Sequence, residues 1–183
     1  LGVGLAGQGD AESGVLSLPE QGQSTATLTG VHGLNYLVGE GSEITFTVRE
    51  QLTRLPLPND AVVRTNALSG GLNFDGQPTV VEVNLLTLSS DQNFRDQYMR
   101  GRMFLNSPVA VFTVNELNDL PPEFFSGETF NRQVAGTLNI NGIGVPLTFD
   151  LGIRNDGDVL NVLGRAVFTW EQVGMRVPTA QLA

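Results

Sequence analysis

Apolar and polar residues alternate with a period of two through most of this chain from residue 36 onward. In the segment 42–50, SEITFTVRE, isoleucine, phenylalanine and valine fall on one face, opposite threonines and an arginine. A period of two is that of a β-strand whose two faces meet different surroundings. The same pattern recurs in segments 66–76, 79–89, 109–117, 133–153 and 159–170. The chain therefore predicts about seven or eight antiparallel strands with one face in water.

Turn signals separate these segments. NING at 139–142 and RNDGD at 154–158 predict hairpins, because Asn and Gly tolerate the positive φ of tight turns. Glycines inside the predicted strands, such as Gly70, Gly71 and Gly136, indicate bends or bulges where the sheet curls. A curled antiparallel sheet loses its exposed edges when it closes into a barrel. We therefore predict an all-β fold built as an antiparallel β-barrel.

One segment, SSDQNFRDQYMRGRMF at 89–104, interrupts the strand pattern and predicts a short helical insert. Ser89 and Gln92 match a capping box, and Gly101 is placed to end the helix. Asp96 and Arg100 are four residues apart, a spacing that predicts an ion pair. We interpret this insert as a cap over one mouth of the barrel.

Composition excludes several kinds of function. The 183 residues include no cysteine and one histidine, which removes thiolate chemistry and argues against a histidine-rich metal site. With a net charge of −9, the surface as a whole should repel nucleic acid and anionic membranes. No run of eighteen apolar residues occurs, so no transmembrane helix is expected. We predict no enzyme activity, no catalytic residues, no metal site and no cofactor.

Residues 1–32 differ from the rest, being rich in Gly, Ser, Gln and Thr. We predict an N-terminal arm at 1–32 and a β-barrel domain at 33–183. The stretch 14–30 suits an added edge strand, and the arm is also a candidate for docking onto a protein partner or a second copy. LGVGLAGQGDA at 1–11 resembles the end of a secretion signal, which predicts a periplasmic, extracellular or cell-surface protein.

The order of the motifs resembles the YceI-like family, the polyisoprenoid-binding β-barrels of bacterial periplasms. The resemblance covers about residues 36–178, and Tyr98 stands where the family often has histidine. The motifs that carry it are SEITFTV, SGGLNFDG, VVEVNLLTLSSDQNFRD, RMFLNSPVAVF, GTLNINGIGVPLTF and FTWEQVGMRVP.

The resemblance implies an extended, eight-stranded, lipocalin-like barrel whose apolar interior holds a long isoprenoid or fatty chain. The inward-facing strand residues then become the candidate ligand-binding lining: Ile44, Phe46, Val48, Leu72, Phe74, Val81, Val83, Phe112, Val114, Leu138, Ile140, Leu147, Phe149 and Phe168. The insert adds Phe94, Tyr98, Met99 and Met103 to the candidate ligand-binding residues, and the two methionines could form a pliable gate. The plainer interpretation, in which all of these side chains simply pack as core, stays open.

Four charged residues of the insert are candidates for the rim of the site. Arg95 and Asp96 would form a latch for a lipid head group, or alternatively an ion pair within the chain. Arg100 and Arg102 would meet a phosphate or carboxylate, since arginine suits bidentate anion contacts, or alternatively face solvent.

Two functions follow as hypotheses. The leading one is non-enzymatic binding of a polyisoprenoid, quinone or fatty chain inside the barrel of an exported protein. The alternative is a structural or accessory subunit of an extracellular assembly, held through residues 1–32, with the barrel packed shut.

Overall fold

The computed structural model describes residues 2–7, 27–31, 35–50, 59–115, 117 and 119–175, with side chains described for 35–48, 60–115, 117 and 119–175. The strands are β1 (Gly2–Gly7), β2 (Thr27–Val31), β3 (Asn35–Val38), β4 (Ile44–Glu50), β5 (Asn59–Thr65), β6 (Leu68–Asn73), β7 (Thr79–Asn84), β8 (Val109–Val114), β9 (Phe130–Ile140), β10 (Ile143–Asn155) and β11 (Val159–Val167). The helical segments are η1 (Leu85–Thr87), α1 (Asn93–Tyr98), η2 (Met99–Met103) and α2 (Pro122–Ser126).

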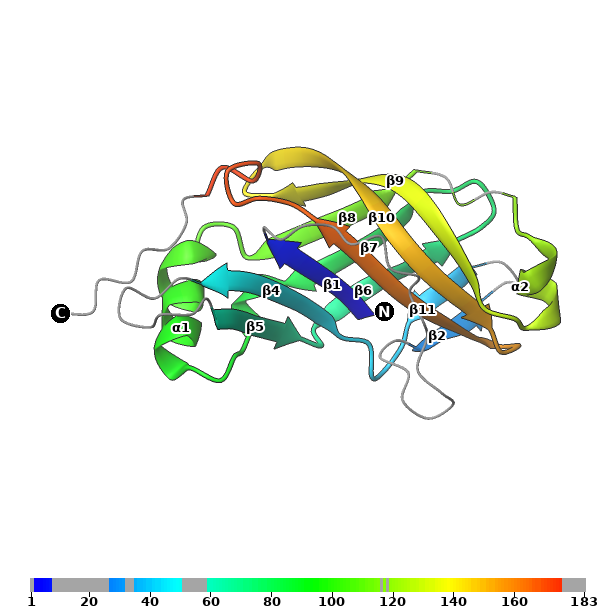
Figure 1. Cartoon of the computed structure of the whole chain (residues 1–183), viewed down its shortest axis with the longest axis horizontal. Helices are drawn as coiled ribbons and strands as arrows, with labels where there is room; N and C mark the ends of the chain where they lie inside the picture. The colour runs from blue at the N-terminus through cyan, green and yellow to red at the C-terminus, as the bar shows by residue number, and fades with distance from the viewer. Residues whose placement is uncertain are drawn as a thin grey trace.

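All of these strands belong to one sheet, in the order β10-β9-β8-β7-β6-β3-β2-β11-β1-β4-β5. The sheet curls strongly, because β10 pairs not only with β9 but also with β11 (Figure 1). The ladders from β11 through β2, β3, β6, β7, β8 and β9 to β10 are all antiparallel. The prediction of a mostly-β fold with a curled antiparallel sheet and few helices is confirmed.

Two strands from the predicted arm share one edge of β11. β2 pairs antiparallel with Val159–Asn161, and β1 pairs parallel with Leu163–Val167. β1 is also parallel to β4 on its other side, so it lies between β11 and β4 (Figure 1). Both strands therefore pair within their own chain. The rest of the stretch 14–30, which suited an added strand, lies outside the described residues.

The hairpin predicted at NING is present between β9 and β10. Asn141 and Gly142 adopt φ values of 56° and 72°, the pair of positive angles that a two-residue turn requires. Gly70 in β6 is required for a different reason, the close approach of the neighbouring strand. Gly70 has φ of 108°, and a Cβ at this position would overlap the carbonyl oxygen of Val80 in β7. Only glycine allows the two strands this approach.

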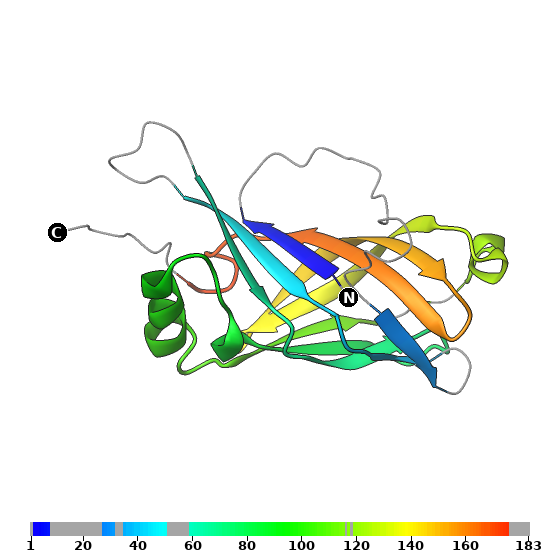
Figure 2. The ribbon, with the colours of Figure 1, turned by 90° about the horizontal axis from the view of Figure 1, so that it is seen from below.

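The two longer helical regions lie at opposite ends of the elongated molecule (Figure 2). α2 begins with Pro122 and is followed by Gly127 at φ 75°, the usual order of proline at the start and glycine past the end. At the other end, α1 continues directly into the wider turn η2. No helix in the described part of the chain is long and apolar enough to cross a membrane.

The predicted boundaries of the helical insert are wrong. Ser89 forms a backbone bridge with Arg64 of β5, so it does not cap the helix. The neighbouring Ser90 accepts the N–H of Gln92 instead. Gly101 lies inside η2, and the segment ends at Phe104, whose N–H donates to the Met99 carbonyl.

The core lies between the inner faces of the curled sheet. In β7, Thr79, Val81 and Val83 are buried while the residues between them are exposed, as a period of two requires. The same alternation along β8, β9 and β10 directs their large apolar side chains into one continuous cluster. The inward residues of the sheet therefore define the interior in which a ligand site can form.

Candidate ligand-binding interior

A small apolar cavity lies between β6, β7, β8, β10 and β11. Its volume is about 40 Å³. Eight apolar side chains and one threonine line it: Leu72, Thr79, Val81, Phe112, Val114, Leu117, Phe149, Leu151 and Val162. A single water needs roughly 10–15 Å³ of such volume, so the cavity admits only a few groups of that size. A long isoprenoid tail does not fit this cavity with the side chains in these positions.

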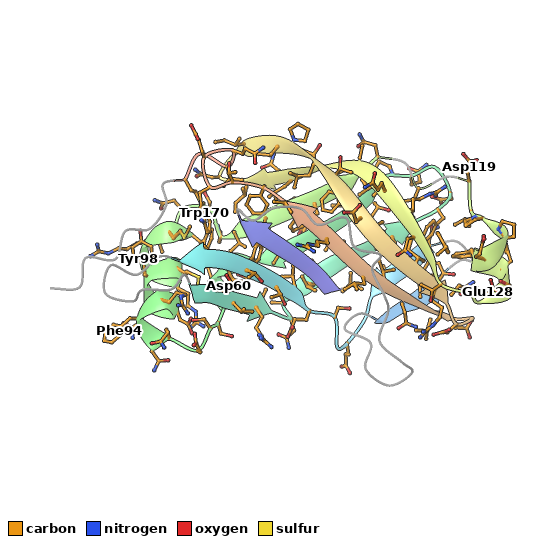
Figure 3. All side chains as sticks on the ribbon, in the orientation of Figure 1. Asp60, Phe94, Tyr98, Asp119, Glu128 and Trp170 are labelled. Carbon is orange, nitrogen blue, oxygen red and sulfur yellow. The ribbon has the colours of Figure 1, made fainter. Side chains whose placement is uncertain are left out.

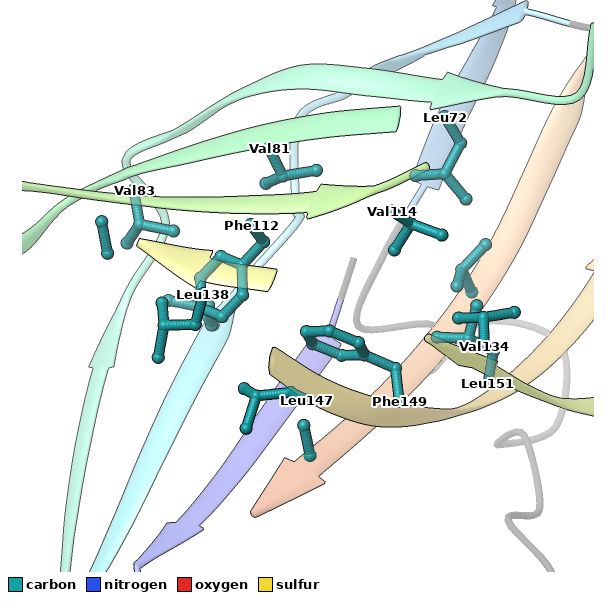
Figure 4. Close-up of a cluster of buried hydrophobic side chains, with 14 of the residues drawn as sticks. Leu72, Val81, Val83, Phe112, Val114, Val134, Leu138, Leu147, Phe149 and Leu151 are labelled. Atoms are coloured by element: carbon teal, nitrogen blue, oxygen red, sulfur yellow. The ribbon is translucent and has the colours of Figure 1, made fainter. Parts of the chain in front are cut away.

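Phe149 of β10 and Phe112 of β8 are the two aromatic residues of the cavity lining, and Figure 4 shows both rings within the buried cluster. Their ring centroids are 6.1 Å apart and their planes are 78° to one another, the edge-to-face arrangement that aromatic pairs favour. The Phe149 ring packs over Gly136 of β9, where a Cβ would come within 2.9 Å of its Cε2 atom. The bare glycine therefore makes the space that the ring occupies.

Most predicted lining residues are indeed inside, and five of them border the cavity: Leu72, Val81, Phe112, Val114 and Phe149. Others are buried in the same core cluster without reaching the cavity lining: Ile44, Phe74, Val83, Leu138, Ile140, Leu147 and Phe168. Phe46 packs half-buried against the cluster, and Val48 is half-buried. Their burial fits the core interpretation, and their role in ligand binding stays a prediction.

Four residues of the cavity wall were missed by the sequence analysis: Thr79, Leu117, Leu151 and Val162. Leu151 follows Leu147 and Phe149 at the same two-residue spacing along β10, so continuing that pattern would have found it. Val162 was harder, because β11 buries three consecutive residues, Leu160, Asn161 and Val162, and the alternation breaks there.

Aromatic side chains close the interior at the α2 end. Phe124 of α2 is buried, with its ring centroid 5.6 Å from that of Phe74 and 6.5 Å from that of Phe130. Tyr36 packs edge-on against Phe74 at 6.1 Å. Burial raises the pKa of the Tyr36 phenol above its ordinary value, and the nearby Asp158 carboxylate adds to this. This end of the sheet is thus filled by rings that pack edge-on or tilted against one another.

At the α1 end the interior is closed by Leu85, Leu88, Met99 and Phe104, which are all buried. Met103 packs half-buried against them in the core cluster. Met99 and Met103 therefore lie where a gate was predicted, and they also fill the core as the plainer interpretation expected.

Phe94 and Tyr98 do not line the interior, and this part of the prediction is wrong. Phe94 is 86% exposed and Tyr98 is 43% exposed, and both point away from the sheet (Figure 3). The physical reason is the orientation of α1, which turns Asp96 and Met99 inward. Phe94 and Tyr98, four residues apart, then share a flank that faces solvent.

The charged residues of the insert are held by local contacts. Arg95 Nη1 is 2.8 Å from the Asp91 carboxylate. Asp96 is buried and accepts hydrogen bonds from both the N–H and the hydroxyl of Ser90. The predicted ion pair between Asp96 and Arg100 is absent from this described segment, because Arg100 donates from Nε and Nη2 to the Leu88 carbonyl instead.

The lining of the cavity is apolar apart from one threonine. Among residues 35–48, 60–115, 117 and 119–175, no three His, Asp or Glu side chains gather as a metal site would require. The nine side chains around the cavity include no titratable group. The arrangement can enclose apolar matter and exclude water.

A family model described as the YceI-like domain matches residues 36–180. The chain belongs to the YceI-like family. This membership confirms the resemblance inferred from the motifs. The match begins after β2, so β1 and β2 lie outside it. A comparison with proteins of curated function finds no match.

Among solved structures, the YceI-like chain is similar to a polyisoprenoid-binding domain from Saccharophagus degradans that is implicated in plant cell wall breakdown. The two share 17% sequence identity, with a TM-score of 0.47 over 76% of this chain and 71% of the other.

Proposed function

We propose that this protein binds the chain of a polyisoprenoid, or of a similar apolar lipid, inside a closed eight-stranded barrel. Membership of the YceI-like family is the observation that carries the proposal. Each methylene-sized group that leaves water contributes about 0.8 kcal/mol, so a long tail needs no polar anchor to bind tightly. The uncharged lining of the cavity supports an apolar ligand over a charged one.

The ligand enters by widening the small cavity, which we take to be the ligand-free form of the site. Leu72, Val114 and Phe149 stand around it on three different strands. Rotation of the Phe149 ring away from Gly136 is the smallest change that lengthens the space, because the ring already lies against a residue without a side chain. The ligand's buried area then offsets the contacts that these side chains lose.

The proposed setting is outside the cytoplasm, where an exported carrier would meet membrane-derived lipid; the segment 1–11 is the motive for this part. No cofactor other than the lipid is proposed. The alternative role as a structural subunit held through residues 1–32 gains no support from the comparisons.

A pair of neighbouring valines tests the site. Val81 is 3% exposed and lines the cavity, whereas Val80 is 36% exposed on the outer face of the same strand. Val81→Phe fills the cavity and should abolish uptake of a long-chain quinone, while Val80→Phe should leave uptake unchanged. Uptake is followed through the fluorescence of the single tryptophan, Trp170, which packs against the core.

Protein from its natural source, examined by native mass spectrometry and organic extraction, supplies the second readout. A co-purifying apolar lipid supports the proposal. If gentle preparation yields no lipid, and the wild-type protein takes up neither quinone nor polyprenol, the proposed function is wrong.

A further inference from the structure

An apolar patch is exposed on the helical insert at one end of the molecule. Phe94 is 86% exposed, Tyr98 43% and Leu105 57%. Phe94 and Tyr98 lie on one flank of α1 and point away from the sheet (Figure 3). Single exposed apolar residues are ordinary, but large side chains gathered in one short segment mark an interaction surface. We call Phe94, Tyr98, Arg102 and Leu105 the docking patch.

Positive charge accompanies this patch. The segment 89–108 contains three arginines and two aspartates in a chain of net charge −9. Asp91 is paired with Arg95, and Asp96 is buried against Ser90. Arg100 donates to an uncharged carbonyl, and Arg102 is exposed. Within the described residues neither of these two arginines has an acidic partner, so two positive charges remain in the segment that carries the exposed rings.

The opposite end of the molecule offers a direct contrast. Phe125 of α2 is 72% exposed, much like Phe94. The segment 119–130 that contains it is acidic, however: it carries Asp119, Glu123 and Glu128, and the basic Arg132 of β9 contacts it by donating to the Asp119 carbonyl. Asp119 and Glu128 lie at this end, far from α1 (Figure 3). Phe94 thus lies in a segment with net positive charge, and Phe125 lies in a segment with net negative charge.

We propose that the docking patch binds the surface of a lipid bilayer that contains anionic lipids. Aromatic rings settle at the level of the head groups, and exposed apolar side chains on a basic helical segment insert at the same depth. The guanidinium of Arg102 meets lipid phosphate, for which its planar donors are suited. The acidic remainder of the surface is repelled, which leaves only the α1 end facing the bilayer.

Flotation with vesicles tests the proposal on the full chain. The protein should float with vesicles of phosphatidylcholine and phosphatidylglycerol, and less with phosphatidylcholine alone. Binding should fall as salt rises, because the electrostatic part is screened. Arg102→Gln should weaken binding to the anionic vesicles about fivefold. The double variant Phe94→Ser with Tyr98→Ser should weaken binding to both kinds of vesicle.

Phe125→Ser is the matched control, since it removes an equally exposed phenylalanine from the acidic end and should leave flotation unchanged. Failure of the wild-type protein to float, or an equal loss in the Phe125→Ser variant, would overturn the proposal. So would light scattering that shows the Phe94 and Tyr98 variant to dissociate a dimer, because the patch would then join two copies. Quinone uptake without vesicles separates this outcome from failure of the proposed function: the patch variants should keep it.

Discussion

The ring of Phe149 in β10 rests on the backbone of Gly136 in β9, where there is no side chain to displace it. A Cβ at Gly136 would lie 2.9 Å from Cε2 of Phe149 and 2.6 Å from the carbonyl oxygen of Thr113. The second contact is with backbone, which cannot move aside without disturbing the ladder between β8 and β9. The position of the ring therefore depends on the absence of one methyl group.

Gly136→Ala should destabilise the protein by about 1–3 kcal/mol, because it overpacks the core against backbone. Gly144→Ala in β10 is the control: its Cβ would find its nearest neighbour at 3.5 Å, an ordinary contact. That variant should stay within about 0.5 kcal/mol of wild type. Urea unfolding measures both, and equal midpoints for the two variants would contradict the close contact at Gly136.

Phe149→Ala should lower the free energy of unfolding of the ligand-free protein by about 3–5 kcal/mol, since it leaves a large hole in the core. If the cavity is the ligand site, a saturating apolar ligand should stabilise this variant more than it stabilises the wild type, because the space is already open. Thermal unfolding with and without long-chain quinone gives the comparison. A ligand that stabilises wild type and leaves the variant unaffected would place the site elsewhere.

Asp96→Ala should destabilise the protein by about 1–3 kcal/mol. The substitution removes the acceptor of two hydrogen bonds from Ser90, one of them from a backbone N–H, at a buried position. Asp91→Ala breaks only the pair with Arg95, in which the Asp91 side chain is 77% exposed. That loss should be about 0.2–1 kcal/mol. Denaturant unfolding ranks the two, and the reverse order would refute the role given to Asp96.

Tyr36→Phe should change how stability responds to alkaline pH. Burial, with help from Asp158, raises the pKa of Tyr36 in the folded protein above the ordinary 10.0. The folded form thus holds the phenol proton more tightly, and the resulting stability is fully present below about pH 10 and is lost as pH rises through the raised pKa. The variant should lose free energy of unfolding less steeply above that pH. Tyr98→Phe keeps Tyr36, so its free energy of unfolding should depend on alkaline pH as that of the wild type does.

Deletion of residues 1–7 should promote self-association. β1 pairs with β11 on one side and β4 on the other, so its removal leaves two rows of backbone N–H and C=O groups without partners. Such open edges invite pairing with another chain. Light scattering over a range of concentrations should show dimers or larger species for the shortened protein. A monomer of unchanged stability would mean that β1 adds little to the sheet.

The sequence predicted the strands best where one face is buried along the whole strand. Along β7, β8 and β9 the period of two is unbroken, and all three strands were predicted. β5 was missed, because Pro56 and Pro58 just before it favour a loop and only a short run, AVVRT, follows. α2 was missed too, although Pro122 at its start and Gly127 past its end are signals that could have revealed it.

The candidate site was predictable only as a set of inward residues. Alternation identified Val81, Phe112 and Phe149, because strand geometry alone decides which face they occupy. It could not decide whether that face encloses space, since the volume depends on how rings from different strands pack. For α1 the difficulty was greater: a six-residue helix with apolar side chains on more than one flank does not reveal which flank faces the core, and Phe94 and Tyr98 were assigned to the wrong one.

The parallel ladder between β1 and β11 joins Gly2 to Leu163. β1 can therefore complete its pairing with β11 only after the chain has been made as far as Val167. Contacts between such distant parts of a chain carry a large loop-closure entropy and slow the search for the native state. Formation of the ladder between β1 and β11 should thus be a late event in folding, and until it occurs this edge of β11 stays open to pairing with another chain.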